Sequence, residues 1–134
     1  CLIADELDEV VGAIWWDKPT LNELCFERGK LITQFAKQKI RKGDLLIWER
    51  ELIVSPIHQG QGIGSHLRAA FVKSVLNCCE KGVLIFTRMR DDNLPVIKIA
   101  EKFGFRRIGI RTLSSQKSGV SHEYWCFSQK RRDR

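Results

Sequence analysis

The chain has 134 residues, of which 43% are hydrophobic and 29% charged, the composition of an ordinary globular domain. No apolar run approaches the roughly 20 residues that a membrane-spanning helix needs, so the sequence indicates no membrane partner. The net charge of +7 lies wholly in residues 88–134, because acidic and basic residues balance before them. Such a basic half suits a polyanionic ligand, either a phosphorylated cofactor or nucleic acid.

The chain begins with a strand pattern followed by a helix signal. Residues 10–16 are β-branched and aromatic and predict a strand, paired as a hairpin with residues 2–4. Thr20 and Glu23 stand at capping-box spacing, since each side chain can bond the main chain of the other. A short helix is therefore expected to follow and to stop near Gly29.

The middle of the chain alternates helices with apolar strands. Apolar residues recur at helical spacing after position 31 and predict a second helix up to about Arg41. A long strand is expected over residues 45–54, ended by a Ser-Pro pair. An apolar stripe then predicts a helix from Gly62 to about residue 81, and residues 83–88 read as a buried strand.

The last part of the chain reads as a helix and a hairpin. Asn93 can cap a helix that has Pro95 in its first turn and Gly104 at its end. Two final strands are expected at residues 105–113 and 123–128, with a Ser/Gly-rich turn at residues 114–121 between them. The order β-β-α-α-β-α-β-α-β-β predicts an α/β fold with a mixed sheet and helices on its faces. We expect residues 1–134 to form a single domain that ends in a solvated basic tail at 129–134.

A glycine-rich turn, Gln-Gly-Gln-Gly-Ile-Gly at residues 59–64, joins the long strand to the next helix. Glycine adopts positive φ and lets ligand oxygens approach the main chain, so several N–H groups can converge on a pyrophosphate at the helix N-terminus. A nucleotide P-loop would need Gly-Lys-Ser/Thr, whereas Ser65 and His66 follow Gly64. The alternating glycines also lack the Gly-x-Gly-x-x-Gly spacing of dinucleotide-binding folds. Taken alone, such a turn could equally be a tight connection.

At these residues the sequence resembles the GNAT superfamily of acetyl-CoA-dependent N-acetyltransferases. The family signature, Gln/Arg-x-x-Gly-x-Gly/Ala after a strand, is met by Gln59, Gly62 and Gly64. A second block runs from Asn93 to Glu-Lys-Phe-Gly-Phe at 101–105 and resembles the family's Asn…Glu-Lys-x-Gly-Phe helix. The resemblance covers about residues 9–128 and is strongest between 50 and 106.

The resemblance implies a mostly antiparallel sheet with two splayed central parallel strands, here residues 45–54 and 83–88, flanked by helices. It implies acetyl-CoA (CoA) as co-substrate and no metal. The main chain near the end of the first of these strands would bond the pantetheine amides, the glycine-rich turn would hold the pyrophosphate, and the asparagine would contact the cofactor as well as cap its helix. The predicted cofactor-binding residues are therefore Ile53, Val54, Gln59, Gly60, Gln61, Gly62, Ile63, Gly64, Ser65 and Asn93.

The implied reaction moves an acetyl or other short acyl group to a primary amine by direct attack in a ternary complex. The amine must lose a proton, so a carboxylate is the natural general base. Glu49 and Glu51 lie on the strand that leads to the thioester and, at two-residue spacing, are expected to point to one face. One of them would be the base; the alternative is a solvated charged pair beside Arg50. A main-chain N–H near Ile53 or Val54 would meet the developing oxyanion.

The chain departs from the family pattern at two places. Many members carry a Tyr seven residues after the Asn as acid for the leaving thiolate, and this chain has Ala100; Tyr124 and Ser65 are the substitutes to consider. A non-catalytic acyl-CoA-binding regulatory domain is therefore the alternative function. The family's usual first strand and two helices are not visible ahead of Cys1, so residues 17–43 are expected to shape part of the acceptor pocket.

The partner would be a small-molecule amine or a peptide or protein amine, and the family resemblance makes a homodimer reasonable. Arg90, beside the expected cleft, could meet an acidic acceptor or form a surface salt bridge. Nucleic-acid binding through the basic half is the least favoured function, because this half lacks interleaved aromatic residues on a repeated surface. Five cysteines without a Cys-x-x-Cys pair, and no signal-peptide pattern, favour reduced thiols in a cytoplasmic protein.

Overall fold

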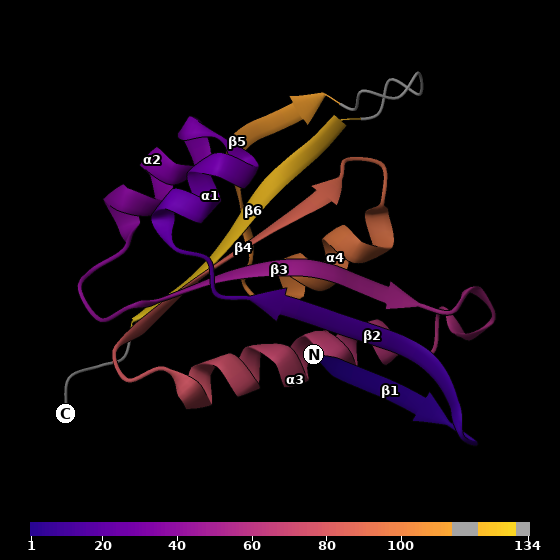
Figure 1. Cartoon of the computed structure of the whole chain (residues 1–134). Coiled ribbons are helices and arrows are strands. Elements are labelled where there is room, and N and C mark those ends of the chain that lie inside the picture. The colour runs from indigo at the N-terminus through magenta and orange to yellow at the C-terminus, as the bar shows by residue number, and fades with distance from the viewer. Residues whose placement is uncertain (114–120, 131–134) are drawn as a thin grey trace.

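The computed structural model describes residues 1–113 and 121–130 and has the element order that the sequence predicts (Figure 1). A short 3-10 turn, η1, adds one element between the long strand and the helix after it. The elements are β1 (Leu2–Glu6), β2 (Glu9–Asp17), α1 (Leu21–Arg28), α2 (Lys30–Lys39), β3 (Leu45–Val54), η1 (Pro56–His58), α3 (Ile63–Cys78), β4 (Gly82–Arg90), α4 (Leu94–Lys102), β5 (Arg106–Leu113) and β6 (Ser121–Lys130).

The strands form one six-stranded sheet in the order β1-β2-β3-β4-β6-β5. Every neighbouring pair is antiparallel except β3 and β4, which run parallel. Their pairing extends only from Leu45 opposite Val83 to Trp48 opposite Phe86. Both strands continue beyond that point, so the sheet opens between them toward their C-terminal ends. The predicted mixed, mostly antiparallel sheet with two splayed parallel strands is confirmed.

Helices cover both faces of the sheet, because the buried side chains of its central strands alternate between two hydrophobic clusters. On β4, Val83 and Ile85 pack in the cluster under α3 and α4, whereas Leu84 and Phe86 pack in the cluster under α1 and α2. The strands β3 and β6 alternate in the same way. The open end of the β3–β4 seam therefore lies between two helical layers (Figure 1).

The helix α1 begins at the predicted capping box. The Glu23 N–H donates to Thr20 Oγ1 at 3.1 Å, and the Thr20 N–H donates to Glu23 Oε1 at 3.3 Å. The helix ends where Gly29 takes a φ of 92°, as the sequence predicts. Leu24 and Ile32 then hold α1 and α2 against the sheet. This arrangement places the end of α1 beside the opening in the sheet.

A β-bulge interrupts β3. Trp15 and Trp16 are adjacent on β2, yet they pair with Glu51 and Glu49, so Arg50 is an extra residue on β3. The bulge breaks the two-residue alternation of side chains. The expectation that Glu49 and Glu51 point to one face is therefore wrong.

Element boundaries differ from the predicted ones by a few residues. The second helix ends at Lys39 rather than Arg41, and β6 includes Gln129 and Lys130, which the sequence assigned to the tail. The predicted Ser/Gly-rich turn, apart from Ser121, and the tail residues 131–134 lie outside the described residues. Among the described helices, none has the length and apolar character needed to cross a membrane.

Candidate active site

A cavity of about 590 Å³ opens where β3 and β4 separate. It is lined by the end of β3, the glycine-rich turn, the start of α3 and the start of α4. All the predicted cofactor-binding residues line it except Gln61, whose side chain is exposed. The lining residues are Leu52, Ile53, Val54, His58, Gln59, Gly60, Gly62, Ile63, Gly64, Ser65, Asn93, Pro95, Val96 and Ile99.

The geometry of the glycine-rich turn leaves the N-terminus of α3 open to this cavity. Gly60 and Gly62 have φ values of 83° and 82°, a region that side chains disfavour. Gly62 is the N-cap of α3, and no side chain bonds the first N–H groups of the helix. The Gln59 side chain donates to the Val54 carbonyl at 3.2 Å and fixes the turn to the strand. Free N–H groups at the positive end of a helix dipole suit a phosphate.

These residues fit an elongated cofactor with a pyrophosphate at one end. The pyrophosphate would lie at the start of α3, where Gly60 and Gly62 leave open space around the main chain. An amide-bearing arm would run along the edge of β3 that has no strand partner beyond Trp48. A Cβ on Gly64 would lie 3.1 Å from Ile99 Cδ1, so this glycine allows α3 and α4 to approach each other beside the cavity.

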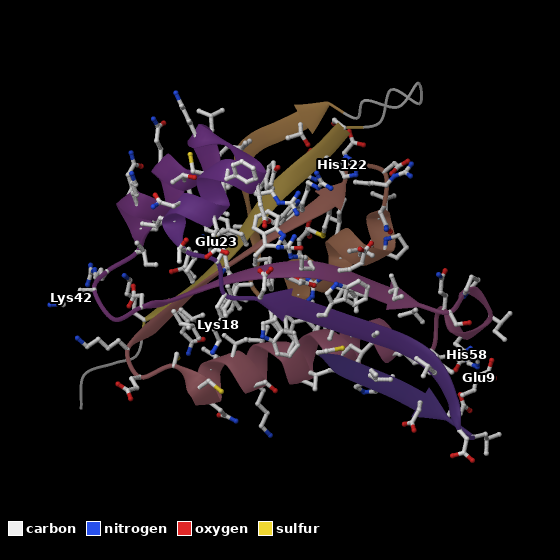
Figure 2. The ribbon with its side chains drawn as sticks, viewed as in Figure 1. Glu9, Lys18, Glu23, Lys42, His58 and His122 are labelled. Carbon is white, nitrogen blue, oxygen red and sulfur yellow. The ribbon has the colours of Figure 1, made fainter. Side chains whose placement is uncertain are left out.

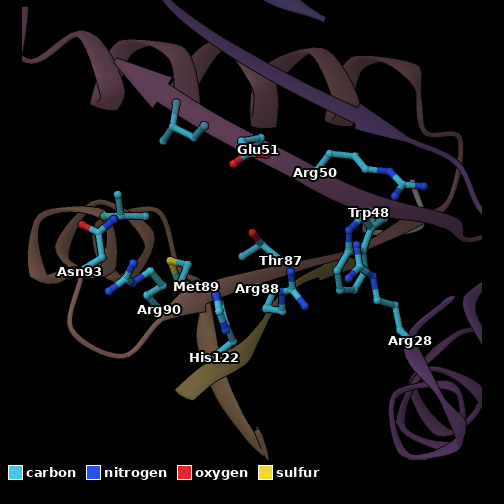
Figure 3. Close-up of a pocket in the computed structure, with 12 residues that line it drawn as sticks. Arg28, Trp48, Arg50, Glu51, Thr87, Arg88, Met89, Arg90, Asn93 and His122 are labelled. Carbon is cyan, nitrogen blue, oxygen red and sulfur yellow. The ribbon is translucent and has the colours of Figure 1, made fainter. Parts of the chain in front are cut away.

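A second, smaller cavity of about 220 Å³ adjoins the first (Figure 3). The two cavities share Leu52, Asn93 and Val96, so a group bound in one can meet a group bound in the other. The small cavity is lined from α1, β3, β4, β6 and the start of α4 (Figure 3). Arg28 is the residue of the stretch 17–43 that lines it.

Glu49 lies outside both cavities. Its side chain is 1% exposed, and Oε1 lies 2.7 Å from Nη2 of Arg68 on α3, an equally buried side chain. The Arg68 guanidinium also lies over the Phe105 ring, 5.0 Å from its centroid. Burial raises the pKa of Glu49, while the positive charge of Arg68 opposes the rise. Glu49 therefore ties β3 to α3 in the core.

Glu51 is exposed and lines the small cavity (Figure 3). Its neighbour Arg50 bonds neither glutamate of the strand. The Arg50 Nε donates to Asp17 Oδ2 at 2.7 Å, and Nη2 donates to Glu27 Oε2 at 3.0 Å. Because Glu49 is buried, the alternative of a solvated pair of glutamates beside Arg50 is wrong, and of the two predicted bases only Glu51 borders the cavities.

His122 also lines the small cavity, and the sequence analysis did not single it out. It pairs with Arg90 across β4 and β6, far from His58 near the β1–β2 hairpin (Figure 2). Burial lowers the pKa of His122, and the charges of Arg88 and Arg90 lower it further against those of Asp91 and Asp92. The neutral imidazole can accept a proton.

The residues considered as proton donors differ in position. Ala100 is fully buried in the core, and Tyr124 is 2% exposed with its ring 5.8 Å from that of Trp48. Tyr124 lines neither cavity, whereas Ser65 lines the larger one. Asn93 occupies the N-cap position of α4 without a side-chain cap bond and borders both cavities. Its amide therefore remains available to a ligand.

The sheet separates between its two parallel strands beside a glycine-rich helix start, as the sequence resemblance implies. Residues 1–105 match the Acetyltransferase (GNAT) family, and the chain belongs to this family. No curated protein matches the sequence. Among the residues that the structure describes, no group of three or more His, Cys, Asp or Glu side chains could hold a metal ion.

Three solved structures illustrate the shared fold. Arabidopsis thaliana NAA60 with a bisubstrate analogue has a TM-score of 0.68 at 16% identity, over 90% of this chain and 66% of that one. YncA, a putative acetyltransferase from Salmonella typhimurium with acetyl-CoA, has a TM-score of 0.67 at 13% identity, over 98% and 65%. The NatC complex with Gag peptide and CoA has a TM-score of 0.64 at 16% identity, over 94% and 65%. The chain thus spans about 65% of the length of the structures it matches.

Proposed function

We propose that the chain is an N-acetyltransferase that moves an acetyl or other short acyl group from acetyl-CoA to a primary amine by direct attack in a ternary complex. The observation that carries the proposal is the junction of the two cavities at Leu52, Asn93 and Val96. A thioester in the larger cavity would there meet an amine in the smaller one. Similar folds that bind CoA with a peptide, or a bisubstrate analogue, support an amine acceptor.

Groups on both sides of the junction would take part in this reaction. Bound acetyl-CoA would supply the activated acyl carbon. Glu51 would take a proton from the amine, whose nitrogen bonds the acyl carbon as the C–S bond breaks and the thiolate leaves. A main-chain N–H of Ile53 or Val54 would meet the charge that develops on the acyl oxygen. His122 is the second candidate base, because its neutral form is favoured.

One observation favours the non-catalytic alternative. Ala100, where many relatives carry the acid for the thiolate, is fully buried and has no proton to give. A chain that binds acyl-CoA without turning it over would serve as a sensor or regulator. The measurement that separates the two functions is CoA release from acetyl-CoA in the presence of a panel of amines.

The first experiment is the change in melting temperature on adding acetyl-CoA, CoA, NAD and ATP separately at equal concentrations. A ligand at 100 times its dissociation constant stabilises the folded state by about 2.7 kcal/mol, which shifts the melting temperature of a domain of this size by several degrees. We expect the shift with acetyl-CoA and CoA only. A shift with none of the four would refute the proposed function.

A further inference from the structure

The small cavity has an excess of positive charge on its wall. Four arginines, a histidine and one carboxylate, that of Glu51, line it. Two of the arginines are neutralised: Arg50 by Asp17 and Glu27, and Arg90 by Asp92 at 3.0 Å. Among the described residues, no carboxylate lies within salt-bridge distance of the other two, Arg28 and Arg88.

The guanidinium of Arg28 packs against an aromatic ring, but its hydrogen bonds are incomplete. Its guanidinium lies over the Trp48 ring, 4.5 Å from the centroid. Its Nε is buried and has no hydrogen-bond partner among the described residues. Burial lowers the pKa of Arg28, and the nearby charge of Arg88 lowers it further. Arg28 and Arg88 thus bring two positive charges without a carboxylate partner among the described residues, and one unbonded buried donor, to the same concavity, which an anion would complement.

We propose that the amine acceptor carries an anionic group, a carboxylate or a phosphate, which Arg28 and Arg88 bind while its amine reaches Glu51. This inference rests on the proposed acetyl transfer. In Figure 3, Arg28 and Trp48 lie at one end of the cavity and Asn93 lies at the other, while Glu51 and Arg88 lie between them on opposite sides. An acceptor with an anion at one end would thus be oriented with its amine toward the cofactor cavity. Planar guanidinium groups match carboxylate and phosphate oxygens.

The test measures acetylation and binding of four amines whose nitrogen is separated by two carbons from a carboxylate, a phosphate, a methyl or a second amine: β-alanine, 2-aminoethyl phosphate, propylamine and ethylenediamine. We expect kcat/KM for at least one anionic amine to exceed that of propylamine by about 10-fold or more, since a charge-assisted hydrogen bond supports that difference. The comparison of β-alanine with 2-aminoethyl phosphate distinguishes carboxylate from phosphate recognition. Ethylenediamine should be the poorest acceptor.

The variants Arg28→Gln and Arg88→Gln, and the double variant that combines them, should remove the preference for anionic amines over propylamine. Arg106→Gln is the control, since Arg106 is exposed on β5 outside both cavities and its loss removes the same charge. Binding is followed separately as the melting shift that each amine causes in the CoA-saturated protein. An anionic preference that persists in the double variant, or no preference in either readout while acetyl-CoA binds, overturns the inference. Failure of acetyl-CoA itself to bind would instead refute the proposed function.

Discussion

At the scale of single residues, Glu49 and Glu51 differ in environment although only Arg50 separates them. Glu51 borders the junction of the cavities, so we expect Glu51→Gln to lower kcat by roughly 10²–10⁴, the usual contribution of a general base. The melting shift caused by acetyl-CoA should remain. Glu101→Gln, on an exposed position of α4 outside both cavities, is the matched control. Unchanged turnover in Glu51→Gln would remove this residue as the base.

Glu49 has a structural role, and its variant should lose stability. Glu49→Gln would leave Arg68 buried without a carboxylate, which costs about 3 kcal/mol or more of the free energy of unfolding. Urea denaturation measures the loss. The double variant Glu49→Leu with Arg68→Met should recover much of it, because an apolar pair leaves no buried charge. Equal stability of Glu49→Gln and wild type would contradict this role.

His122 should make stability depend on pH in a defined direction. The pKa of His122 lies below its ordinary value near 6.5, so below about pH 6.5 the unfolded chain binds more protons at this site than the folded one. Stability is therefore lost as pH falls from 6.5 toward the lowered pKa. The variant His122→Gln should lose less stability than wild type between about pH 7.5 and 5.5 in urea denaturation. A larger loss in the variant would show that the pKa of His122 is raised instead.

At the scale of elements, local signals made most of the fold predictable. The capping box at Thr20, the glycine-rich turn and the apolar period after it are short-range patterns, and each describes contacts within one element. For this reason the order of elements follows from the sequence. The predicted cofactor-binding residues came from the family resemblance instead; nine of the ten line the larger cavity, and the side chain of the tenth, Gln61, is exposed.

The features that escaped prediction depend on pairing between distant strands. The bulge at Arg50 becomes visible only when β3 is paired with Trp15 and Trp16 of β2. His122 reaches the small cavity only because β6 lies beside β4. The pairing of β2 with β3, and of β4 with β6, cannot be read from the spacing of residues along one strand. The sequence therefore placed the side chains of Glu49 and Glu51 on one face by assuming a regular alternation, which the bulge in β3 breaks.

The turn before α3 offers a matched pair of glycine substitutions. Gly62 and Gly109 have φ values of 82° and 77°, and a Cβ at either would meet nothing within 4 Å. Gly62→Ala and Gly109→Ala should therefore cost similar stability, about 1–2 kcal/mol. Only Gly62 lines the cofactor cavity, so only its variant should weaken acetyl-CoA binding in titration calorimetry. Equal affinities would show that the turn is only a connection.

At the scale of the whole molecule, the opening in the sheet sets where a ligand acts on the fold. CoA should slow amide hydrogen exchange along the end of β3 and the first turn of α3, because its arm and its pyrophosphate would cover main-chain groups there. The β1–β2 hairpin, at the edge of the sheet, should change little. If CoA slowed amide hydrogen exchange mainly in β5 and β6, its phosphates would instead lie on the basic C-terminal strands, as a nucleic-acid-binding function requires.

The extra residue in β3 also determines how this strand tolerates changes of length. Deleting Arg50 would leave Glu49 and Glu51 opposite Trp16 and Trp15, so the remaining side chains would keep their faces. Deleting a residue elsewhere in β3 would exchange core and surface positions on one side of the cut. Because a bulge bends and twists its strand, the shortened chain would fold in register with a straighter β3. Arg50, the extra residue, therefore lies where β3 bends, shortly after its pairing with β4 ends at Trp48.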